Sequence, residues 1–248
     1  MHQKNRLTLY YNFNKDGKNA IVTYLSFASS DNTFAYSGVV IIPDKVTYNG
    51  ETYSVTSIDQ CAFWLCSELT SVTIPNSVLS ISSGAFTGCS GLKTVTIPQS
   101  VLNISDLAFQ NCSGLTSVNI HCSPTKIGSN VFIGCDNLKE AVFDSETITP
   151  ILAGFSSLEK VIIKDNSTSI GKNAFYGCKG ITSVTISDNV KSIEEKAFYG
   201  CCGLTSLALS NRLISIGKYA FAECTSLQSV TIPNSVTSIG EGAFHSCI

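Results

Sequence analysis

The sequence has few charged residues and no long apolar run. Charged residues make up 14% of its 248 residues, with 16 basic against 18 acidic, and the basic ones do not cluster. Nucleic acid is therefore not an expected partner, because binding to it depends on concentrated positive charge. No apolar run approaches the roughly 20 residues that a membrane-spanning helix requires, so we expect no transmembrane segment in this chain.

The sequence motifs of common catalytic and metal centres are also missing. There is no Gly-x-Ser-x-Gly elbow, no glycine-rich phosphate loop, no paired-carboxylate cluster and no Cys-x-x-Cys pair. The histidines are His2, His121 and His245, and only His121 adjoins a cysteine, on chain that we expect to be extended. Neighbouring side chains on an extended chain point to opposite faces. We therefore expect no enzyme, no cofactor and no metal, and a hydrolase site on an irregular repeat is the remotest alternative.

What the sequence does contain is one motif at a fixed spacing. Between residues 66 and 247 a Leu-x-x-Val-x-Ile pattern recurs, followed by an Ala-Phe pair and a cysteine. Its leading residues are Leu69, Leu92, Leu115, Leu138, Leu158, Ile181, Leu204 and Leu227, spaced 23 residues apart except for one step of 20 after Leu138. A period of roughly 20–29 residues with such strands is the signature of a leucine-rich repeat solenoid.

Each copy is expected to contain one short strand and one tight turn. Val-x-Ile has the period of two that is typical of a half-buried strand, and the proline after it ends the strand. The segment from Gly84 to Cys89 is expected to form a short helical or 3₁₀ turn. Stacked copies bury the apolar side chains that a single copy would expose. We predict a right-handed superhelix of about eight copies over residues 58–248, with a short copy at 138–157.

Eight of the eleven cysteines share one position in the repeat: Cys66, Cys89, Cys112, Cys135, Cys178, Cys201, Cys224 and Cys247. Stacking places them about 5 Å apart, a spacing that also permits disulfides, so the pattern alone allows both states. We expect reduced core thiols, because free cysteine behaves as a small apolar residue and Phe155 fills the same position in the short copy. Cys61, Cys122 and Cys202 lie outside this position and are expected to be exposed.

The two ends differ from the repeats. Residues 1–57 are expected to form a β cap with a degenerate first repeat, because residues 7–24 and 46–53 each alternate around an Asp-Gly or Asn-Gly turn typical of a β-hairpin. The last copy stops at residue 248 with no cover over its apolar face. We expect either a fragment of a longer protein or end-to-end association through this uncapped end.

The outward-facing residues are the remaining candidates for function. The strands carry a row of serine and threonine that is interrupted at Lys139, Glu140, Val142, Glu159, Lys160 and Ile162. A second row follows each Ala-Phe pair and includes Trp64, Tyr176 and Tyr199. Solenoids bind through extended surfaces, so we take the six interrupting residues as ligand-binding candidates. Drift in a redundant repeat and plain β-propensity explain the same residues without a ligand.

The repeat resembles a known family. The pattern Leu-x-Ser-Val-Thr-Ile-Pro-Asn-Ser-Val-x-x-Ile-x-x-x-Ala-Phe-x-x-Cys, at 69–89 and 227–247, closely resembles the BspA-type leucine-rich repeat over about residues 58–248. Residues 46–58 also look like that family's approach to its first full repeat. Members are mostly secreted or surface-attached proteins of gut and oral anaerobes, associated with adhesion to host matrix proteins. The resemblance transfers no catalytic or binding residue.

These observations predict a non-enzymatic binding or adhesion module, secreted or on a cell surface, that recognises a host protein or glycan through an extended solenoid face. Residues 1–6 are not followed by the apolar core of a signal peptide. The resemblance therefore implies a leader that has been removed from this chain. The alternative is a structural spacer array that displays another domain absent from it.

Overall fold

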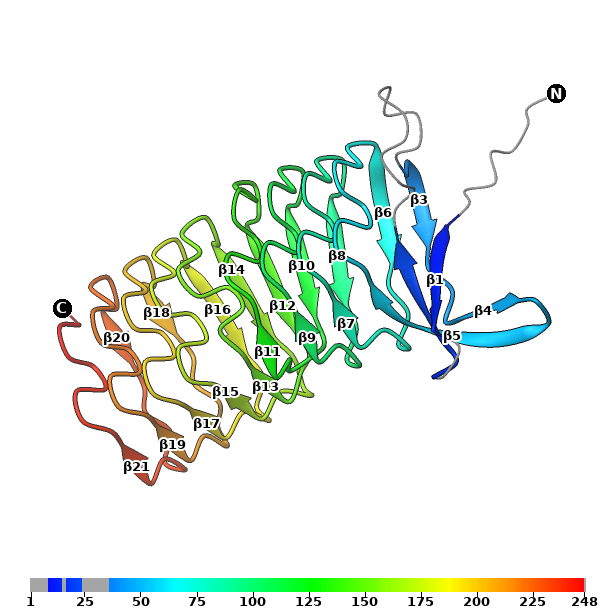
Figure 1. The fold of residues 1–248 in the computed structure, drawn as a ribbon. Coiled ribbons are helices and arrows are strands. Elements are labelled where there is room, and N and C mark those ends of the chain that lie inside the picture. Colours follow the sequence, from blue (N-terminus) through cyan, green and yellow to red (C-terminus); the bar gives the residue numbers. More distant parts are fainter. Residues whose placement is uncertain (1–8, 15–16, 24–35, 248) are drawn as a thin grey trace. The chain divides into compact units, whose positions relative to one another are not determined.

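The computed structural model describes residues 9–14, 17–23 and 36–247. The chain is a β-solenoid of about eight turns, in which strands of successive turns run parallel (Figure 1). It divides into two compact units: unit 1 holds Met1–Leu115 and Pro124–Asp136, and unit 2 holds Thr116–Ser123 and Asn137–Ile248. Within the described ranges, no helix is long and apolar enough to cross a membrane.

Unit 1 combines the predicted cap with the first turns. Its strands are β1 (Tyr10–Asn14), β2 (Asn19–Thr23), β3 (Gly38–Ile41), β4 (Lys45–Tyr48), β5 (Glu51–Ile58), β6 (Leu69–Thr73), β7 (Ser80–Ile81), β8 (Thr94–Ile97), β9 (Asn103–Ile104) and β11 (Lys126–Ile127). The antiparallel pairs β1–β2 and β4–β5 confirm both expected hairpins. From β5 onwards the sheet is parallel through β7, β9 and β11, while the cap boundary at residue 57 stays a prediction.

The strands of unit 2 belong to three parallel sheets. Its strands are β10 (Ser117–Ile120), β12 (Glu140–Phe143), β13 (Thr147–Ile148), β14 (Lys160–Ile163), β15 (Ser169–Ile170), β16 (Ser183–Ile186), β17 (Ser192–Ile193), β18 (Ser206–Leu207), β19 (Ser215–Ile216), β20 (Ser229–Val230) and β21 (Ser238–Ile239). One sheet runs β10, β12, β14, β16 in exact register. Another runs β13, β15, β17, β19, β21, and β18 pairs separately with β20.

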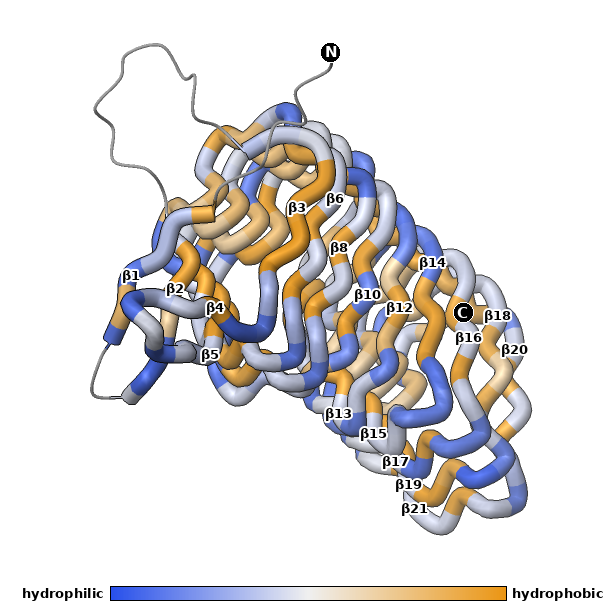
Figure 2. The backbone as a smooth tube through the Cα atoms, turned by 90° about the vertical axis from the view of Figure 1, so that its right-hand side faces the viewer, coloured by the Kyte–Doolittle hydropathy of each residue, from blue (hydrophilic) through white to orange (hydrophobic). Residues whose placement is uncertain are grey.

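The repeat columns form the core, as predicted. In the copy that begins at Leu69, the apolar side chains of the repeat are buried: Leu69, Val72, Ile74, Val78, Ile81, Ala85, Phe86 and Cys89. Phe63, Phe86 and Phe109 stack with ring centroids 4.9 and 5.0 Å apart. Figure 2 shows apolar segments recurring at the same place in successive turns. Each copy is thus covered by its neighbour, which is how a solenoid compensates for the small core of a single repeat.

The Ala-Phe segments are turns with isolated hydrogen bonds between residues three apart, and the described residues form no continuous helix there. The amide of Cys89 donates to the Phe86 carbonyl at 3.2 Å, but the amides of Phe86 and Gly88 donate to Ala108 and Gln110 of the next turn at 2.8 Å. Alternate amides are therefore used between turns, so no helical ladder can form. Gly84 and Gly88 have φ of +60° and +77°, which bends the chain on either side of the pair.

All eleven cysteines are free thiols. At the shared position the thiol donates to the carbonyl of the preceding turn's Ala-Phe segment, as from Cys89 to Phe63 at 3.1 Å and from Cys201 to Phe175 at 3.2 Å. Cys61 and Cys202 are half-buried, whereas Cys122 is only 1% exposed. The expectation of an exposed Cys122 was wrong because His121 stands where other copies have proline, so the alternation continues and turns Cys122 inward.

Candidate functional site

The predicted binding residues lie together on unit 2. In the parallel pair β12–β14, Glu140 is opposite Lys160 and Val142 is opposite Ile162. The Lys160 ammonium is 2.8 Å from the Glu140 carboxylate, and just before the two strands the Lys139 ammonium is 2.7 Å from the Glu159 carboxylate. The six residues therefore form two ion pairs and one apolar pair between adjacent turns.

Val142 does not offer the exposed contact that the sequence predicts. Its side chain is only 8% exposed. Its in-register neighbours, Asn119 on β10 and Ile162 on β14, cover it from both sides. Val142 therefore supports the neighbouring side chains, and Ile162, which is half-buried, supplies the accessible apolar area.

Three further residues extend this face, and the sequence reasoning missed them. Asp144, Lys164 and Ser187 follow β12, β14 and β16 at the position where the copy at Leu69 has Pro75. Their amides donate to the carbonyls of Ile120, Phe143 and Ile163 at 2.9, 2.8 and 3.1 Å. Proline has no such donor, so its replacement lengthens the ladder and carries the alternation one residue further. Loss of proline in successive copies was the available signal.

These residues border an open hollow of about 540 Å³, and its lining consists of Asp144, Ile163, Lys164, Asp165, Asn166, Thr185 and Ser187. The Ser187 hydroxyl donates to an Asp165 carboxylate oxygen at 2.6 Å, and the Asn189 side-chain amide donates to the Asp165 carbonyl at 2.8 Å. These bonds fix one wall of the hollow. Two carboxylates and one ammonium face it, which suits a polar ligand and provides no catalytic set.

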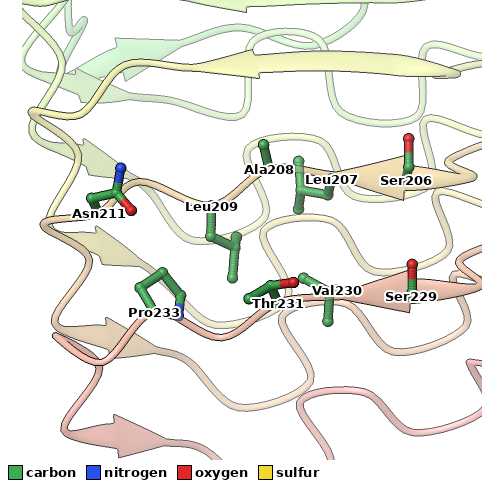
Figure 3. Close-up of a pocket in the computed structure, with 9 residues that line it drawn as sticks. All are labelled: Ser206, Leu207, Ala208, Leu209, Asn211, Ser229, Val230, Thr231 and Pro233. Atoms are coloured by element: carbon green, nitrogen blue, oxygen red, sulfur yellow. The ribbon is translucent and has the colours of Figure 1, made fainter.

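A second hollow of about 440 Å³ lies over β18 and β20 (Figure 3). Ser206, Ala208 and Ser229 project to one side, while Leu207 and Val230 project to the other. Its lining contains no ionisable side chain: Ser206, Leu207, Ala208, Leu209, Asn211, Ser229, Val230, Thr231 and Pro233. Among the residues that the structure describes, no group of three His, Cys, Asp or Glu could hold a metal ion.

The second outward row contains one aromatic pair in unit 2. The rings of Tyr176 and Tyr199 stack with centroids 5.1 Å apart and planes 7° apart. The Tyr199 hydroxyl donates to a Glu223 carboxylate oxygen at 2.6 Å, and this hydrogen bond raises the pKa of Tyr199 to about 12. Trp64 and Tyr176 are each 42% exposed, whereas Ala222 in the same row is fully buried.

Comparison with known proteins gives a family and a fold. The family described as "BspA type Leucine rich repeat region (6 copies)" matches residues 45–154 and 152–248. No curated protein matches the chain.

Several solved structures are similar to it. A leucine-rich cell surface protein of Faecalibacterium prausnitzii A2-165 is 22% identical with a TM-score of 0.53, over 97% of this chain and 74% of that one. A leucine-rich repeat protein of T. pallidum is 23% identical with a TM-score of 0.51, over 92% of each chain. At these identities the two structures support the fold alone. The family match covers nearly all of the repeats, and the chain belongs to the BspA-type leucine-rich repeat family.

Proposed function

We propose that this chain is a non-enzymatic binding module whose ligand is a protein held on the β12–β16 face. We define this face as Glu140, Asp144, Lys160, Ile162, Lys164, Thr185 and Ser187. The observation that carries the proposal is the change of residue type across three strands in register. Alternate positions along each strand and the residue after it are acidic, apolar and acidic for β12, where the apolar Val142 is buried, basic, apolar and basic for β14, and hydroxyl-bearing for β16.

The charges on this face divide into paired and unpaired ones. Lys160 and Glu140 neutralise each other, and an exposed ion pair of this kind contributes only about 0–1 kcal/mol to folding. Within the described chain, the Lys164 ammonium and the Asp144 carboxylate take part in no ion pair. Both border the hollow, so a ligand there can form ion pairs with charges that are not already paired within the folded chain. Ile162 lies between the paired and the unpaired charges and supplies apolar contact.

A surface or secreted location is part of the proposal. The F. prausnitzii relative is described as a cell surface protein, and the family resemblance points the same way. A protein in that position meets extracellular partners first. We therefore propose a host extracellular protein as the ligand, bound by many polar contacts over a wide face, as solenoids commonly bind.

The test measures binding of the chain to a panel of immobilised, purified extracellular matrix proteins by biolayer interferometry. Lys164→Glu and Ile162→Asp should each weaken binding on the order of tenfold, which corresponds to about 1.4 kcal/mol. Lys191→Glu is the matched control, because it makes the same charge change at an exposed lysine outside the face. Circular dichroism checks that each variant is folded.

A double exchange separates specific recognition from net charge. Glu140→Lys with Lys160→Glu keeps the ion pair and the net charge but reverses their direction across the strands. We expect this variant to fold and to lose affinity. Equal binding by the exchange, Lys164→Glu and the wild type would show that the face is not used, and absence of any matrix ligand would favour a spacer role.

A further inference from the structure

The Tyr176–Tyr199 stack on unit 2 has one end that is closed and one that is open. One face of the Tyr199 ring stacks on Tyr176, and the Tyr199 hydroxyl donates a hydrogen bond to Glu223. Tyr176 uses only the face that meets Tyr199. Its side chain is 42% exposed, and no hydrogen bond of its hydroxyl occurs within the described part of the chain.

The open end faces the turn that contains Ala153. The amide of Gly154 donates to the Tyr176 carbonyl at 2.6 Å, just as the amide of Gly177 donates to the Tyr199 carbonyl at 2.7 Å. Ala153 therefore holds the position before Tyr176 in the row that Tyr176 holds before Tyr199. Where a third ring would continue the stack, this turn offers only a methyl group.

Ala153 and Gly154 in this turn are both exposed. A Cβ built on Gly154 would meet no atom within 4 Å, and one built on Gly177 would meet only the Gly154 Cα, at 3.8 Å. The two tyrosine rings stack at 5.1 Å, so a flat ligand ring could lie on the free face of Tyr176 at a similar separation. The short copy thus has an exposed methyl group where the next two copies have a tyrosine ring.

We propose that the free face of Tyr176 binds a neutral pyranose ring of a glycan. The face of an aromatic ring carries partial negative charge, and the C–H groups on one face of a pyranose carry partial positive charge. The unpartnered Tyr176 hydroxyl can exchange a hydrogen bond with a sugar hydroxyl. An apolar peptide side chain would leave that hydroxyl without a partner, which is unfavourable once water is displaced.

This site is independent of the β12–β16 face, since no residue of the Tyr176–Tyr199 stack belongs to that face. Failure of one proposal therefore leaves the other untouched. Tyr199 serves as a positioning residue, because the Glu223 hydrogen bond holds the ring on which Tyr176 rests.

The experiment is saturation-transfer-difference NMR on the whole chain with the methyl glycosides of glucose, galactose, mannose and N-acetylglucosamine. We expect at least one glycoside to bind, with transfer concentrated on the C–H protons of one ring face. Tyr176→Ala should reduce its affinity on the order of tenfold or more. Tyr176→Phe keeps the ring and should reduce it only a few-fold, by about the strength of one hydrogen bond.

Ala153→Tyr is the decisive variant, because it keeps Tyr176 and fills the vacant position with a ring. It should abolish sugar binding while leaving the thermal midpoint unchanged or higher. Tyr48→Ala removes another tyrosine of similar exposure (46%) from the cap and should bind sugar like the wild type. Binding by Ala153→Tyr, or no transfer to any glycoside, would overturn the proposal. So would binding of a proline-rich or aromatic peptide at Tyr176 when no glycoside binds.

Discussion

At the scale of single residues, the repeated cysteine is a buried hydrogen-bond donor. The sequence predicts burial and a reduced thiol, and both are found at Cys89, Cys112 and Cys201. The sequence could not predict the hydrogen-bond acceptor, because each thiol donates to a carbonyl 26 residues earlier, in the preceding turn. That separation becomes visible only when the stacking offset between turns is known.

Burial of these thiols should make the protein sensitive to alkaline pH. Burial raises the pKa of Cys66 and Cys178 from 9.0 to about 11. The folded protein therefore retains protons that the unfolded chain has released, so stability is level below about pH 9 and falls as pH rises towards 11. Each thiol adds a slope of about 1.4 kcal/mol per pH unit in that window.

Urea unfolding followed by circular dichroism, at several values between about pH 7 and pH 10.5, measures this dependence. Cys178→Ala is the control, because it removes one thiol while every lysine and tyrosine stays. Its stability should fall less steeply with pH than that of the wild type. An identical slope in both proteins would refute the assignment.

Backbone conformation gives a second prediction for single residues. Gly200 and Lys196 flank the pair Ala197–Phe198 with φ of +70° and +55°. A Cβ on Gly200 would meet only the Gly177 Cα at 3.8 Å, so Gly200→Ala tests conformation without a clash. It should cost about 1 kcal/mol.

Lys196→Gly should do the opposite and stabilise by about 0.5 kcal/mol, because relief of the left-handed strain exceeds the entropy that glycine adds to the unfolded chain. Chemical denaturation measures both changes. Equal destabilisation by the two substitutions would contradict the role of the left-handed positions.

At the scale of elements, the strands could be predicted and the turns could not. The Val-x-Ile pattern itself shows which side chains of the strand alternate between the core and the solvent, so residues such as Val95 and Ile97 could be placed inward from the sequence alone. The Ala-Phe segment looks helical locally, but the Phe86 amide donates to Ala108 in the next turn. Long-range partners thus decide the geometry of these turns, and a local pattern does not contain them.

The stacked phenylalanines should dominate stability at this scale. Phe198 is fully buried between Phe175 and Phe221, with ring centroids 5.1 and 5.3 Å away. Phe198→Ala should cost about 3–5 kcal/mol, because it leaves a cavity in a column that cannot close. Phe244 stacks only on Phe221 and is half-buried.

Phe244→Ala should therefore cost less, about 1–2 kcal/mol. The two variants remove the same atoms, so the difference in unfolding free energy between them isolates the effect of burial. Similar losses for both would mean that the stack does not act through burial.

At the scale of the whole chain, one repeated pattern determines the fold class but not the ligand. The cluster of Lys139, Glu140, Lys160 and Ile162 could be anticipated, because residues at equal positions in successive copies become neighbours. The hollow beyond it could not, since it depends on how far each ladder continues after its strand. Family membership follows from the pattern as well, and the ligand stays a prediction.

The short copy has one more consequence, for protein engineering. It omits residues between Phe143 and Leu152, while the pairing of β12 with β14, the pairing of β13 with β15 and the 26-residue thiol contact from Cys178 to Leu152 are preserved. The length of this segment can therefore vary next to β13 without loss of the pairing between β13 and β15. A foreign peptide grafted after Asp144 would be displayed at the rim of the hollow without disturbing the periodic interior, which makes the natural deletion a ready insertion point for designed loops.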